Sequence, residues 1–92
     1  MQDIENKTAY ITGGAKGIGM GIAQALLENG VKVAVSGRDK KALENAKQIL
    51  NSENLIVLQS DVRNFNDEQR AIEQIVSQFG KLDVVIANAG VG

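Results

Sequence analysis

Residues 12–19 read T-G-G-A-K-G-I-G, and four of these eight residues are glycine. The preceding residues, Thr8–Ile11, favour a strand, and a helical repeat of apolar residues begins at Ile18. A glycine cluster between a strand and a helix permits positive φ and brings a ligand close to the backbone. The free N–H groups at the start of the helix attract anions. A side chain at Gly13 or Gly19 would obstruct a ligand or the packing of helix on strand. Tight packing alone is the alternative explanation for the glycines.

Helix-like and strand-like segments alternate outward from this cluster. Apolar residues repeat at helical spacing over residues 18–28, 43–50 and 66–79, and apolar runs stand at 31–35, 55–58 and 82–87. Asp39 is a suitable N-cap for the second helix, and we expect the third helix to open at Asn66–Asp67. The side chains expected to face the core are Ile18, Ile22, Ala25 and Leu26 in the first helix, Leu43, Ala46, Ile49 and Leu50 in the second, and Ile72, Ile75, Val76 and Phe79 in the third.

The order β-α-β-α-β-α-β, with short connections, predicts one α/β domain over residues 1–92 with a doubly wound parallel sheet. Nearly continuous apolar strands are typical of sheets covered on both faces. Right-handed crossovers place the first two helices on one face and the third on the other, which gives the strand order 3-2-1-4. Tyr10, the only tyrosine, is expected in the core.

Composition excludes several classes of function. The net charge is −1 and no long basic run occurs, so the sequence does not predict a nucleic-acid partner. Cysteine and histidine are both absent, which removes the thiol nucleophile and the commonest metal ligands, and we predict no metal site. No apolar run approaches the length of a membrane span and no signal peptide is evident, so we predict no membrane partner and a cytoplasmic location.

The motifs together resemble those of the short-chain dehydrogenase/reductase family, in its compact branch. Thr12-Gly13-x-x-x-Gly17-x-Gly19 is similar to the cofactor loop of that family, Asp61-Val62 to its adenine-contacting pair, and Asn88-Ala89-Gly90 to the end of its N-N-A-G motif. Ala87 replaces the first Asn of that motif, which is a departure. The resemblance implies a Rossmann-like fold that is incomplete relative to the family. It also implies a dinucleotide-binding site made of Gly13, Ala15, Lys16, Gly17, Ile18, Gly19, Arg38, Asp61, Val62, Asn88, Ala89 and Gly90.

The end of the second strand bears on the choice of nicotinamide cofactor. An acidic residue there would bind the ribose 2′-OH of NAD, but Ser36-Gly37 occupies the position and Arg38 follows. Arg38 and Lys16 suit a 2′-phosphate, so we expect NADP rather than NAD. The alternatives are that both cations are solvated surface charges and that Asp39 is the ribose acid.

Two further expected contacts have structural alternatives. Asp61 contacts adenine if the resemblance holds for that residue, but the same carboxylate could cap a turn. Asn88 could contact the ligand, or its amide could tie together the ends of neighbouring strands.

The Tyr-x-x-x-Lys pair that the family uses for proton transfer does not occur in this sequence. The resemblance therefore implies the cofactor-binding segment of an NAD(P)-dependent oxidoreductase that transfers hydride to or from a carbonyl or alcohol, and a chain that is inactive alone. One helix on the second sheet face leaves the fourth strand as an exposed edge, which favours a homo-oligomer through the uncovered face or edge. The alternatives are a free-standing nucleotide-binding module and a self-associating chain without ligand function.

Overall fold

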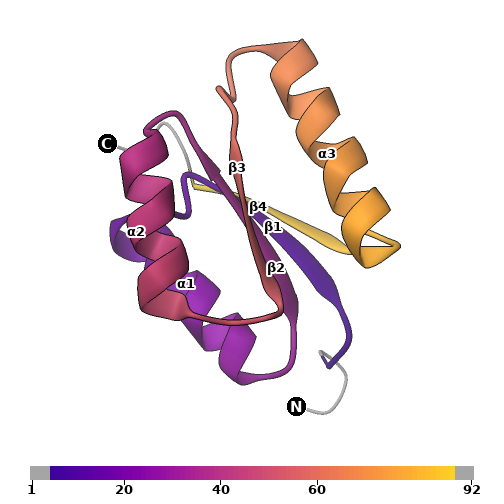
Figure 1. Cartoon of the computed structure of the whole chain (residues 1–92). Coiled ribbons are helices and arrows are strands. Elements are labelled where there is room, and N and C mark those ends of the chain that lie inside the picture. Colours follow the sequence, from indigo (N-terminus) through magenta and orange to yellow (C-terminus); the bar gives the residue numbers. More distant parts are fainter. Residues whose placement is uncertain (1–4, 89–92) are drawn as a thin grey trace.

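The computed structural model describes residues 5–88, which form one parallel sheet and three helices. The elements, in chain order, are β1 (Thr8–Thr12), α1 (Gly17–Glu28), β2 (Lys32–Gly37), α2 (Lys40–Leu50), β3 (Leu55–Gln59), α3 (Phe65–Phe79) and β4 (Val84–Ala87). The sheet has the order β3-β2-β1-β4, with every neighbouring pair parallel. The expected α/β fold and strand order are thus confirmed. Figure 1 shows α1 and α2 on one face of the sheet and α3 on the other.

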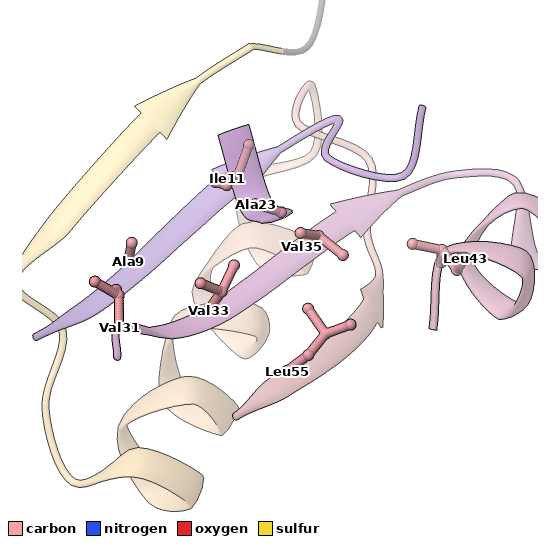
Figure 2. Packing of buried hydrophobic residues seen from close by; sticks show 8 residues of the cluster. All are labelled: Ala9, Ile11, Ala23, Val31, Val33, Val35, Leu43 and Leu55. Atoms are coloured by element: carbon pink, nitrogen blue, oxygen red, sulfur yellow. The ribbon is translucent and has the colours of Figure 1, made fainter. Parts of the chain in front are cut away.

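The core beneath α1 and α2 is built mainly from alternate residues of the central strands. Ala9 and Ile11 of β1 point to the same face as Val33 and Val35 of β2 (Figure 2), as the two-residue period of a strand requires. The remaining buried members of this cluster are Ala23, Val31, Leu43 and Leu55.

Among residues 5–88, α3 is the one helix that covers the opposite face. Its core contains Tyr10, Ala34 and Leu58 from the strands and Ala71 and Ile75 from the helix. Tyr10 is only 1% exposed, which agrees with its expected place in the core.

The helix faces expected from the sequence are partly wrong. Ile18 is 75% exposed and Ile49 69% exposed, and Ala25 also lies in solvent. In α1 the small residues Gly19 and Ala23 face the sheet instead, because close approach of the helix leaves little room there. In α3 the side chains of Ile72 and Val76 are 39% and 42% exposed, since no second helix of the described chain flanks α3 on this face.

The expected ends of several elements also shift. Strand β2 covers Lys32–Gly37 rather than residues 31–35, and β3 extends one residue further than expected, to Gln59. Helix α1 begins one residue earlier than expected, at Gly17. Helix α3 begins at Phe65 because the preceding Asn64, rather than Asn66, caps it by accepting from the Asp67 N–H at 3.1 Å. Strand β4 starts at Val84 instead of residue 82. The residue before it, Asp83, clamps β1, since its carboxylate accepts from the Thr8 N–H at 2.8 Å and its N–H donates to the Thr8 carbonyl.

Within residues 5–88, no helix has the length and apolar character needed to cross a membrane. The same residues contain no group of three acidic side chains placed to hold a metal ion.

Candidate functional site

A cavity of about 690 Å³ opens where β1, β2 and β3 end, beside the starts of α1 and α2. In a parallel sheet all carboxyl ends lie on the same side, which explains why loops far apart in the sequence meet here. The cavity is lined by Gly13, Ala15, Lys16, Gly17, Ile18, Ser36, Gly37, Arg38, Asp39, Ala42, Ser60, Asp61, Val62, Arg63 and Asn88.

The glycine loop is shaped by backbone conformation and by close packing. Gly13 and Gly17 have φ of 68° and 55°, in the left-handed region that favours glycine. A Cβ on Gly14 would lie 2.6 Å from Val35 Cγ1, and one on Gly19 would lie 2.7 Å from the Gly13 carbonyl oxygen. The loop therefore needs glycine both for its course and for contact with the sheet and helix. Gly14, which sequence reasoning did not single out, makes the contact with the core.

The first turn of α1 differs from those of the other two helices described. Asp39 caps α2 by accepting from the N–H groups of Lys41 and Ala42, and Asn64 caps α3. Helix α1 has Lys16 at its N-cap and no side chain that accepts from its first N–H groups. Those donors, together with the positive end of the helix dipole, border the cavity and suit an anionic ligand.

Two cationic side chains lie at the cavity, as expected from the sequence. Lys16 and Arg38 are both exposed, and neither makes an ion pair with another residue of the described chain. Ser36 and Gly37 leave the end of β2 without a carboxylate. The carboxylate of Asp39 is engaged in capping α2, which is the role expected for it.

Asp61 forms a pair with Arg63 that the sequence did not indicate. Its Oδ1 accepts from the Arg63 backbone N–H at 2.9 Å and from Nε at 3.1 Å, and its Oδ2 accepts from Nη2 at 3.0 Å. The side chain of Arg63, followed by its backbone N–H, lowers the pKa of Asp61 to about 2. Asp61 is therefore a charged acceptor at neutral pH, and it also closes the turn after β3.

Asn88 connects the end of β4 to the glycine loop. Its backbone N–H donates to Thr12 Oγ1 at 3.0 Å, and its Nδ2 donates to the Gly13 carbonyl at 3.2 Å. Asn88 thus ties together the ends of neighbouring strands, which is the structural role that the sequence offered as the alternative to ligand contact. The residue also borders the cavity, so a contact with a ligand stays a prediction.

The structure brings most of the expected site residues together. The cavity wall includes Gly13, Ala15, Lys16, Gly17, Ile18, Arg38, Asp61, Val62 and Asn88. Gly19 is buried behind the loop, and Ala89 and Gly90 lie outside the described residues.

Six residues of the cavity wall were not among the expected site residues. Within the site, Ser36, Gly37 and Asp39 entered only the choice between NAD and NADP, and Ala42, Ser60 and Arg63 were missed altogether. Two of the missed residues gave some signal by position: Ser60 follows β3 and directly precedes Asp61, and Arg63 follows that aspartate by two residues, the spacing of an Asx-turn. Nothing in the spacing indicated that the guanidinium turns back onto the carboxylate.

The donor set fits a ligand that carries a diphosphate and a polar ring system. Uncapped amides and a glycine-rich loop meet the requirements of the phosphates, and Lys16 and Arg38 add positive charge. Asp61 supplies a charged acceptor on another part of the wall, after β3.

The family model described as short chain dehydrogenase matches residues 7–92. A short-chain dehydrogenase/reductase, PhomF′, from Diaporthe leptostromiformis is 39% identical over 89 residues, which are 96% of this chain and 30% of the relative. A crystal structure of a short chain dehydrogenase from Bacillus anthracis superposes with a TM-score of 0.89 and 40% identity, over 94% of this chain and 35% of the other.

A third match is a 3-ketoacyl-(acyl-carrier-protein) reductase from Brucella melitensis, solved in complex with NADH. It has a TM-score of 0.84 and 32% identity, over 89% of this chain and 33% of the other. The chain thus spans about a third of the length of the proteins it matches.

Proposed function

Because this chain belongs to the short-chain dehydrogenase/reductase family, we propose that its cavity binds a nicotinamide adenine dinucleotide. The observation that carries the proposal is the uncapped start of α1, which meets a glycine loop at the carboxyl ends of three parallel strands. The diphosphate would occupy this position, held by backbone N–H groups. The similar reductase from Brucella melitensis was solved with NADH, which supports a dinucleotide of this kind.

The other parts of the cofactor follow the remaining walls of the cavity. In this proposal Asp61 and Val62 lie beside the adenine, and Asn88 contacts the part of the cofactor nearest the end of β4. A contact by Ala89 and Gly90, which lie outside the described residues, stays a prediction from the motif. Lys16 and Arg38 bind the 2′-phosphate of NADP, which we propose as the preferred cofactor. Support for NADP comes from these two cations, which make no ion pair within the described chain, and from the absence of a carboxylate at Ser36 and Gly37.

Calorimetric titration of the purified chain with NADP and with NAD tests both levels of the proposal. We expect binding of both dinucleotides, with NADP the tighter. The Arg38→Asp variant should weaken NADP binding about ten- to a hundredfold, the scale of a lost charge-assisted contact, and should change NAD binding little. Lys47→Asp, which makes the same change of charge on α2 outside the cavity, is the control. Equal affinity of the wild-type chain for NADP and NAD would contradict the NADP preference alone, and no binding of either would contradict the whole proposal.

We also propose that residues 1–92 provide cofactor binding rather than proton transfer. In the family reaction the dinucleotide gives a hydride to a carbonyl carbon or takes one from an alcohol carbon, and a proton moves to or from the oxygen. Tyr10 does not border the cavity, and its hydroxyl lies 3.0 Å from Ser36 Oγ and 2.8 Å from Glu68 Oε2 inside the core.

The expected outcome is that the 92-residue chain binds NADPH without oxidising it in the presence of simple ketones. Absorbance at 340 nm measures that oxidation. Steady turnover by the chain would contradict this division of roles.

A further inference from the structure

The Asp61–Arg63 pair is more constrained than an ordinary surface ion pair. The guanidinium donates one hydrogen bond to each carboxylate oxygen. The Arg63 backbone N–H donates the third hydrogen bond of the pair, to Oδ1. The backbone of Asp61 is fixed as well, because its N–H donates to Asp67 Oδ2 at 3.2 Å. The carboxylate that borders the cavity is therefore held in one orientation from both sides.

The bonds to Arg63 also determine how many further donors Asp61 can accept. A carboxylate oxygen has two lone pairs, so a full carboxylate accepts about four hydrogen bonds. Oδ1 already accepts two and Oδ2 accepts one within the described chain. One acceptor position is left on the carboxylate, and it belongs to Oδ2.

We infer that Arg63 is a positioning residue. It makes Asp61 a fixed acceptor for a single donor at the end of the cavity where the adenine base is proposed to lie. The inference rests on the proposed dinucleotide function and extends it to a residue outside the expected site. A 6-aminopurine such as adenine presents an N–H donor to this oxygen. A 6-oxopurine such as hypoxanthine presents a carbonyl, whose oxygen would face the carboxylate without a hydrogen.

The low pKa of Asp61 supports this role, because the carboxylate stays ionised, and hence a pure acceptor, over the whole neutral range. Without Arg63 the side chain could rotate and hydrate, and the orientation that favours the amine would have to be restored on binding. Removal of Arg63 should therefore reduce the discrimination between the two bases more than it reduces the overall affinity for the cofactor.

The experiment compares affinities for a natural cofactor and for its hypoxanthine analogue by calorimetry. Both the NADPH and the NADH pairs are titrated, so that the result does not depend on the 2′-phosphate. The variants are Arg63→Ala and Arg63→Lys, which keeps the charge but cannot form the bidentate pair. Lys81→Ala is the control, because it removes an exposed ion pair that does not involve the cavity: Lys81 pairs with Asp83 at 3.3 Å, is 50% exposed and does not border the cavity. Circular dichroism confirms that each variant is folded.

We expect the wild-type chain to prefer the adenine cofactor about tenfold or more, the scale of one hydrogen bond to a charged group. Arg63→Ala should reduce this preference to about threefold or less, with Arg63→Lys in between and Lys81→Ala unchanged. A preference that Arg63→Ala leaves intact or increases overturns the inference. Equal binding of both bases by the wild-type chain overturns it while the dinucleotide proposal stands, and binding of neither cofactor overturns both.

Discussion

Gly14 shows, at the scale of a single residue, how packing rather than ligand contact can require a glycine. A Cβ there would lie 2.6 Å from Val35 Cγ1 and 2.8 Å from Val35 Cβ, atoms of a rigid β-branched side chain in the core. We expect Gly14→Ala to lower the free energy of unfolding by about 1–3 kcal/mol, as overpacked cores do. Urea denaturation measures the change.

Gly21 provides the matched control, because it lies in the middle of α1 with open space where a Cβ would be. Gly21→Ala should raise the free energy of unfolding by about 0.5–1 kcal/mol through helix propensity alone. If Gly14→Ala raised the free energy of unfolding as Gly21→Ala does, the close approach at Gly14 would not limit the size of the residue there.

Burial of Tyr10 predicts that the stability of the chain depends on pH in the alkaline range. Burial and the neighbouring Glu68 raise its pKa from the ordinary 10.0 to about 12, while the Ser36 hydroxyl acts in the opposite direction. The folded chain thus holds the phenol proton more tightly than the unfolded chain. The resulting stability is complete below pH 10 and is lost as the pH rises through about 12, and it amounts to about 2–3 kcal/mol at most.

The measurement is direct because the chain has one tyrosine and no tryptophan, so absorbance at 295 nm reports Tyr10 alone. Urea denaturation between pH 9 and pH 12 should show a steeper loss of stability for the wild-type chain than for Tyr10→Phe. Parallel curves for the two proteins would mean that other groups, such as the lysines, account for the alkaline loss.

At the scale of elements, the start of α3 differs between the sequence expectation, Asn66, and the structure, in which Asn64 is the N-cap. The Asn64 side chain accepts from the Asp67 N–H, whereas Asn66 lies inside the first turn. We expect Asn64→Ala to cost about 1 kcal/mol of unfolding free energy, the usual effect of losing an N-cap. Asn66→Ala should be nearly neutral. Thermal unfolding of the two variants side by side decides between the two helix starts, and a larger loss for Asn66→Ala would support the start at Asn66.

The elements also show how far local sequence determines the fold. Apolar runs, glycine stops and the Asp39 cap depend on neighbouring residues, so all seven elements could be predicted in order. The parallel order followed because right-handed crossovers leave few arrangements. Which face of a helix is buried depends on what packs beside it. The periodicity of apolar residues therefore could not predict that Ile18 and Ile49 are exposed.

The candidate site divides in the same way. Residues that follow β1, β2 and β3 could be expected at one edge, since parallel strands end together. The Arg63 grip on Asp61 and the contact of Gly14 with Val35 depend on side-chain directions that only the folded chain defines. Motif spacing located the cavity, but it did not show which groups hold its walls in place.

At the scale of the whole molecule, β4 forms an outer edge of the sheet within the described chain, and apolar side chains stand on it. Val84 is 46% and Val85 55% exposed, and Val85 pairs in register with Tyr10 on the face that α3 covers only in part. Phe65, on α3, is 78% exposed. Open strand edges with apolar side chains pair with other chains unless charge or cover prevents it.

We therefore expect the 92-residue chain to self-associate at micromolar concentrations, and we expect a charge on the edge to oppose it. Val85→Lys should shift the sedimentation-velocity distribution toward the monomer, because an inward-pointing lysine on an edge strand disfavours pairing. Val84→Lys tests the same edge from the other face. Ile49→Lys, at a residue 69% exposed on α2, changes hydrophobicity and charge equally but lies on another element and should leave association unaltered. A wild-type chain that sediments as a monomer throughout this range, or three variants that dissociate it equally, would show that the β4 edge does not drive assembly.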